Sequence, residues 1–141
     1  MEHPSSSAVQ QAAEAALLAE AERQLGVRFG DALPCLSGLK LDGFADGNTP
    51  VCVEVFAHVG PCKAGQQRKL SRDMTKLLLA ERRLGKPCRK VIVVGDAAAV
   101  GHLTNGWDGE FAREFGIELL VVDVGDVHCR AVRAAQERQR R

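Results

Sequence analysis

Two carboxylates, Asp42 and Glu54, are the residues of this sequence best placed to do chemistry together. They lie in two short apolar runs that flank residues 46–50, DGNTP, which have the composition of a five-residue hairpin loop. If Ala45 pairs with Val51, Asp42 lies opposite Glu54. Directly opposed residues of a hairpin share one face of the sheet. This register therefore predicts a pair of carboxylates that could hold a divalent cation.

The same register assigns the neighbouring side chains to two faces. Lys40, Phe56 and His58 join the carboxylates, and alternating valines occupy the other face (Val51, Val53, Val55 and Val59). Glu54 stands between apolar neighbours, where an unpaired charge is costly. This favours a metal or polar site, although an ion pair with a lysine would also satisfy Glu54, and turn chemistry would also explain Asp42. His58 is either a ligand or a core histidine with satisfied hydrogen bonds.

A basic segment follows the hairpin. Residues 61–90 contain ten Lys or Arg and two acids, although the whole chain has a net charge of +1. A helix is predicted from about Lys63 to Leu84, and its spacing places four polar residues along one face: Gln66, Lys69, Asp73 and Lys76. A basic helix beside an acidic hairpin suits a site for a metal and a polyanion. A solvated charged face is the alternative.

Bulk properties restrict the class of protein. The 141 residues suit one domain, predicted over 8–141 after a flexible N-terminus at 1–7. Tyr is absent and Trp107 is the only indole, which argues against a stacking platform for single strands. The five cysteines form no CxxC pair and have no His at zinc spacing, so they are expected to be free thiols. Without a membrane-length apolar run or a signal-peptide pattern, a soluble cytoplasmic protein with no membrane partner is expected.

The remaining segments predict an α/β fold. Helices are expected at 8–25, 97–103, 107–115 and 126–141, and buried strands at 89–96 and 117–124. Because strands joined through helices run parallel, we expect a mixed sheet in which the antiparallel hairpin adjoins parallel strands, with helices on both sides. In the first helix, Glu14, Glu20 and Glu22 are expected to face water, although one of them could lean towards the hairpin site.

This order of elements and the two carboxylates resemble the PD-(D/E)xK nuclease superfamily, which has the restriction-endonuclease-like fold. The motif maps onto Leu41-Asp42 and, after a gap, onto Glu54-Val55-Phe56. The resemblance implies that Asp42, Glu54 and the Val55 carbonyl bind Mg²⁺ or Mn²⁺. Leu41 replaces a common Pro of the family, and Phe56 replaces its Lys, which orients water or stabilises the transition state. An aromatic ring can do neither.

Another residue must then supply the positive donor, and Lys63 is the first candidate because it stands at the start of the predicted helix. Lys40, Gln66 and Lys69 are the alternatives. The sequence therefore predicts a metal-dependent nuclease with Asp42, Glu54 and Lys63 as catalytic residues and DNA as the expected partner. The nucleic acid would be contacted by Lys40, His58, Gln66, Lys69 and Lys76. A symmetric dimer would suit duplex cutting. The alternative is an inactive nuclease-like module that binds nucleic acid or a protein.

Overall fold

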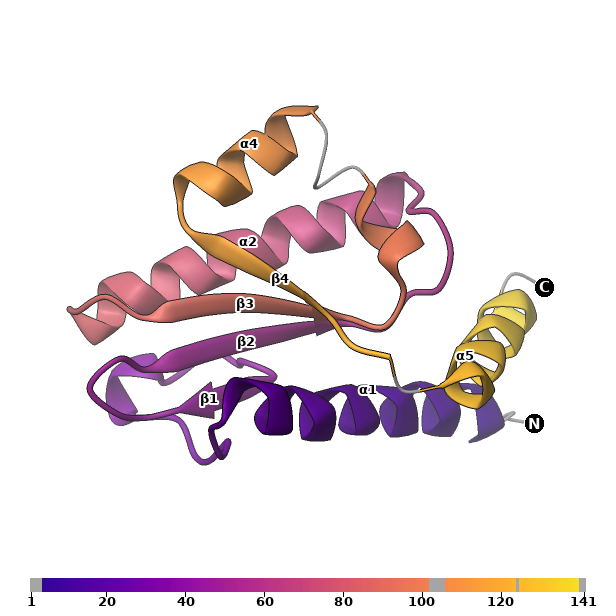
Figure 1. Ribbon diagram of the computed structural model, residues 1–141, viewed down its shortest axis with the longest axis horizontal. Coiled ribbons are helices and arrows are strands. Elements are labelled where there is room, and N and C mark those ends of the chain that lie inside the picture. The colour runs from indigo at the N-terminus through magenta and orange to yellow at the C-terminus, as the bar shows by residue number, and fades with distance from the viewer. Residues whose placement is uncertain (1–3, 102–105, 124, 140–141) are drawn as a thin grey trace.

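The protein is a four-stranded mixed sheet with helices on both faces (Figure 1). The computed structural model describes residues 4–101, 106–123 and 125–139. The elements in chain order are α1 (Pro4–Leu25), the 3₁₀ helix η1 (Pro34–Leu36), β1 (Gly43–Ala45), β2 (Val51–Phe56), α2 (Ala64–Leu84), β3 (Arg89–Val94), the 3₁₀ helix η2 (Ala97–Val100), α4 (Gly106–Glu114), β4 (Ile117–Val121) and α5 (Asp126–Gln139). The predicted α/β class is confirmed.

The strand order is β1-β2-β3-β4, antiparallel between β1 and β2 and parallel elsewhere. Ala45 pairs with Val51 and Gly43 with Val53. The predicted hairpin register is therefore confirmed, and it follows from the five-residue loop and from the alternation of the valines. Asp42 directly precedes β1, so its position is set by the pairing of Gly43.

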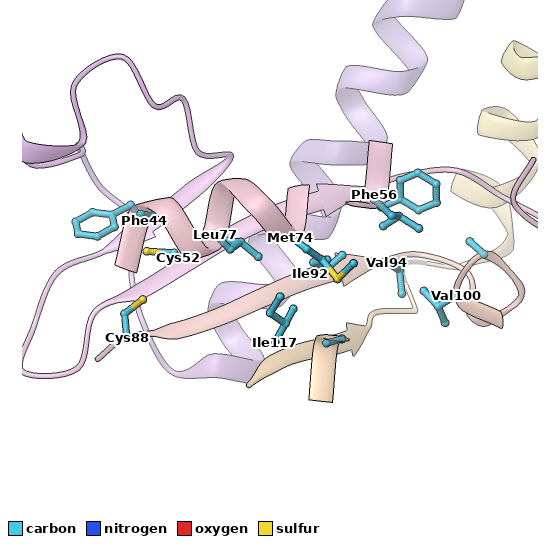
Figure 2. Close-up of a cluster of buried hydrophobic side chains, with 14 of the residues drawn as sticks. Phe44, Cys52, Phe56, Met74, Leu77, Cys88, Ile92, Val94, Val100 and Ile117 are labelled. Carbon is cyan, nitrogen blue, oxygen red and sulfur yellow. The ribbon is translucent and has the colours of Figure 1, made fainter. Parts of the chain in front are cut away.

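The two faces of β2 pack against different helices. Phe56 and Cys52 join a core with Leu70 and Leu77 of α2, shown in Figure 2. On the opposite face lies a second core, which joins valines of β2 and β3 to Leu17 and Ala21 of α1 (Val51, Val53, Val55, Val91 and Val93). The side chains of β2 thus alternate between the two faces as the sequence predicts, and Glu54 is turned towards α2.

Several boundaries differ from the prediction. α1 begins at Pro4, inside the segment predicted to be flexible, and proline is favoured in the first turn of a helix because its missing N–H has no partner there. The strand predicted at 117–124 ends at Val121, and its burial is partial because β4 is an edge strand, not a strand covered on both faces. Parts of the other predicted segments lie outside the described residues, namely 102–105, 124 and 140–141.

The C-terminal end of α2 is fixed by local chemistry. Gly85 adopts a left-handed conformation with φ of 70°, and its N–H donates to the carbonyls of Glu81 and Arg82. The helix therefore stops where the sequence predicts, and the chain turns directly into β3. Among the described residues, no helix is long and apolar enough to cross a membrane.

An ion pair between a buried lysine and a partly exposed glutamate joins the end of α2 to β3 and supplies a first prediction. Lys90 Nζ donates to Glu81 Oε2 at 2.8 Å, and the Lys90 side chain is 7% exposed. Removing the carboxylate would leave a buried ammonium without its partner. A Glu81→Ala variant is therefore expected to lose about 3–5 kcal/mol in the free energy of unfolding, measured by urea denaturation.

The matched control for this prediction is Glu118→Ala. Glu118 pairs with Arg89, but both side chains of that pair are close to half exposed. Its loss should stay below about 1 kcal/mol because solvent screens surface ion pairs. Equal losses in the two variants would show that the Lys90 pair contributes no more than a surface contact.

Candidate functional site

The carboxylates of Asp42 and Glu54 are interlocked through the backbone of the hairpin. The N–H of Asp42 donates to Glu54 Oε2 at 3.0 Å, and the N–H of Val55 donates to Asp42 Oδ2 at 2.8 Å. Each strand thus holds the side chain of the other. On the other face of the sheet, Gly43 lets Phe29 pack closely on the strand, since a Cβ there would lie 3.2 Å from Phe29 Cδ2. Two acids predicted from the sequence to lie together do so.

Glu54 is an unusual carboxylate because it is 1% exposed. Burial raises the pKa of Glu54 to about 7, helped by the side chain and charge of Asp42 and opposed by Lys76 and by the backbone N–H of Asp42. Lys76 Nζ lies 2.5 Å from Glu54 Oε1. The contact is not aligned as a hydrogen bond, and Oε1 has no hydrogen-bond partner among the described residues. Lys76 therefore balances the buried carboxylate as an ion pair, and a strongly shifted acid in a cleft is typical of functional sites.

The carboxylates lie in a cleft of about 570 Å³ between the hairpin and α2. Its wall is basic: Lys40 comes from the segment before β1, and Lys69, Arg72 and Lys76 come from α2. Such a wall beside two acids would attract a polyanion that carries a cation with it. The cleft brings together five of the residues predicted from the sequence: Lys40, Asp42, Glu54, Lys69 and Lys76.

Lys69 and Asp73 form a second charged pair in the cleft. Lys69 Nζ donates to Asp73 Oδ2 at 2.8 Å and lies 5.6 Å from the centroid of the Phe56 ring. Burial raises the pKa of Asp73, against the opposing effect of Lys69. An ammonium group from α2 therefore lies above the ring of Phe56, the residue that replaces the motif lysine.

Four of the predicted residues do not line this cleft: Lys63, His58, Gln66 and Val55, whose side chain packs in the core on the α1 side. Lys63 is exposed at the start of α2, where its N–H donates to Gln66 Oε1 at 3.0 Å. His58 is buried, lies beside the Phe56 ring, and places Nε2 3.2 Å from the carbonyl oxygen of Pro61. Lys63 and Gln66 therefore form the N-terminal cap of α2. His58 is a core histidine with a hydrogen-bond partner, which was the alternative to its role as a ligand.

Sequence reasoning did not single out Arg72 and Thr75, which line the cleft because of how α2 is rotated against the sheet. Glu14 of α1 also belongs to its surroundings: burial and the charge of Asp42 raise the pKa of Glu14, and Lys69 opposes them. Glu14 is thus an acid of α1 whose pKa responds to the charges of the cleft. Glu20 instead forms an ion pair with Arg23.

The carboxylate oxygens of the cleft suit Mg²⁺ better than a metal that must be surrounded by protein side chains. Among the described residues, no three His, Cys, Asp or Glu gather to hold an ion. Mg²⁺ is commonly bound by one or two carboxylates, with water and substrate phosphates completing the coordination. Asp42 and Glu54 supply two such carboxylates, and a metal ion at Glu54 Oε1 would have to displace Lys76.

Comparisons of the chain with protein-family models, with curated proteins and with solved structures gave no match. Any conclusion about function therefore depends on the chemistry of this cleft.

Proposed function

We propose that the protein is a divalent-metal-dependent nuclease that hydrolyses phosphodiester bonds of DNA in the cleft between the hairpin and α2. The observation that carries the proposal is the buried Glu54 carboxylate, interlocked with Asp42 and facing a basic wall. Asp42, Glu54 and the Val55 carbonyl would hold Mg²⁺ or Mn²⁺. The metal ion, when bound, lowers the pKa of water and neutralises charge on the phosphate.

The residues of α2 would supply the remaining requirements of phosphodiester cleavage. Lys76, which already contacts Glu54 Oε1, is the best-placed donor for the charge that develops on the phosphate. Lys69 and Arg72, with Lys40 on the opposite side, would hold the backbone of the nucleic acid. Asp73 would orient Lys69 through their hydrogen bond.

A metal titration tests the proposal directly. We expect saturable binding of Mn²⁺ to the parent protein by calorimetry and Mn²⁺- or Mg²⁺-dependent cleavage of DNA, both lost in Asp42→Asn. Asp46→Asn is the matched control, since Asp46 lies in the hairpin loop and bonds to the N–H of Gly47. Binding and cleavage that persist in Asp42→Asn would refute the proposed metal site.

Phe56 favours a second candidate function. Its ring is fully buried where the superfamily motif has lysine, which suits a nuclease-like module that binds a partner without cutting. This module would not bind Mn²⁺, but it would still bind nucleic acid through the basic wall of the cleft. Salt-dependent binding without metal uptake or cleavage would therefore support the module over the enzyme.

The identity of the donor lysine gives a separate prediction. A Lys76→Met variant should lose about 10²–10³-fold in kcat for DNA cleavage because the developing charge would lack its donor. Lys63→Met is the matched control and should remain within roughly threefold of the parent, since Lys63 does not line the cleft. The reverse order of effects would assign the donor to Lys63.

A further inference from the structure

Two cysteine thiols are in contact inside the core on the α2 side of the sheet. Cys52 of β2 is fully buried and Cys88, the residue before β3, is 8% exposed. Each of the two thiols shifts the pKa of the other. Figure 2 shows both sulfur atoms at the same end of the hydrophobic cluster, near Phe44. The contact is between residues far apart in sequence, with the whole of α2 between them.

The surroundings make the two thiols unequal. The Cys52 thiol lowers the pKa of Cys88, against the effects of burial and of Glu81, and the Lys90 ammonium lowers it further. The pKa of Cys52 is raised by the Cys88 thiol and by burial. Cys88 is also the more exposed thiol, at 8% against 0% for Cys52, so it is the one that an oxidant reaches first.

The backbone leaves Cys88 room to approach Cys52. The ladder between β2 and β3 begins at Arg89, whose N–H donates to the Pro50 carbonyl at 2.8 Å. The N–H of Cys88 donates instead to Glu81 Oε2 at 3.0 Å. Cys88 therefore lies outside the ladder, so its movement towards Cys52, to the sulfur–sulfur distance of about 2 Å, would break no rung of the sheet.

We propose that Cys52 and Cys88 are an oxidation site that forms a reversible disulfide with hydrogen peroxide and thereby closes a covalent loop around α2. The Cys88 thiolate attacks one peroxide oxygen, the O–O bond breaks, and hydroxide leaves and takes up the proton that Cys88 released. The Cys52 sulfur then attacks the sulfenic sulfur, the S–O bond breaks, and the Cys52 proton leaves with the hydroxyl as water. The two cysteines together lose two hydrogens, and the peroxide is reduced to two waters.

Mass spectrometry of the peroxide-treated protein tests this inference. Reaction should remove two hydrogens from the intact chain, and peptide mapping after alkylation in denaturant should find Cys52 linked to Cys88. Dithiothreitol should restore both thiols. The melting temperature of the oxidised protein should rise by about 5–10 °C because the cross-link restricts the unfolded chain.

Variants distinguish the pair from the other thiols. Cys52→Ala and Cys88→Ala should each abolish the disulfide, whereas Cys62→Ala should retain it, since the Cys62 thiol donates to the Ala99 carbonyl on a different part of the fold. The peptide map of the unmodified sequence decides the question even if a core variant fails to fold. Recovery of Cys52 and Cys88 as alkylated thiols after oxidation, or a disulfide to any other cysteine, would overturn the inference.

Discussion

A Glu54→Gln variant is expected to lose at least about 10³-fold in metal-dependent cleavage of DNA, because it removes the charge of the buried ligand while preserving its shape. The amide can still accept the N–H of Asp42, which now bonds to Glu54 Oε2. The hairpin should therefore keep its register. The measurement is kcat under saturating Mn²⁺, and activity within tenfold of the parent would exclude Glu54 from the metal site.

The stability of the metal-free protein provides the control for folding. Burial raises the pKa of Glu54 to about 7 from its ordinary value of 4.5, so the folded chain binds this proton more tightly than the unfolded chain does. The free energy of unfolding should therefore fall as the pH rises through this window, by up to about 3 kcal/mol. In a chelating buffer the parent should show this fall and Glu54→Gln should show a smaller one, since Glu14 and Asp73 also have raised pKa values. Urea denaturation of both proteins at the two ends of the window measures the difference.

A Phe56→Lys variant, which would restore the lysine of the superfamily motif, is expected to lose at least about 3 kcal/mol in the free energy of unfolding. Phe56 is 2% exposed and packs in the core with residues such as Leu70 and Met74. A lysine would leave part of that space empty and would bring a second ammonium close to Lys69, whose Nζ lies 5.6 Å from the ring centroid.

The control for this substitution is Phe56→Leu, which retains an apolar side chain and should lose only roughly 1–2 kcal/mol. Urea denaturation compares the two variants, and a cleavage assay accompanies it. If Phe56→Lys were as stable as the parent and cut DNA faster, position 56 would belong to the site. Its assignment to the core would then be wrong.

The sequence by itself determined the hairpin and the acid pair. The period of two in VCVEVF and the five-residue loop set the pairing of Ala45 with Val51, which places Asp42 beside Glu54. Gly85 likewise ended α2 where the pattern predicts, because a left-handed residue stops a helix by local sterics. These features depend on neighbours in the chain or on strand alternation, which the residue types specify directly.

Only the tertiary structure decided which basic residues face the acids. Lys63 and Lys76 lie on the same helix, yet Lys76 contacts Glu54 and Lys63 does not line the cleft. The rotation of α2 is set by how Leu70, Met74 and Leu77 pack against the sheet, and helical periodicity does not specify that angle. The contact between Cys52 and Cys88 arises in the same way, because two segments distant in sequence meet only when β2 and β3 pair.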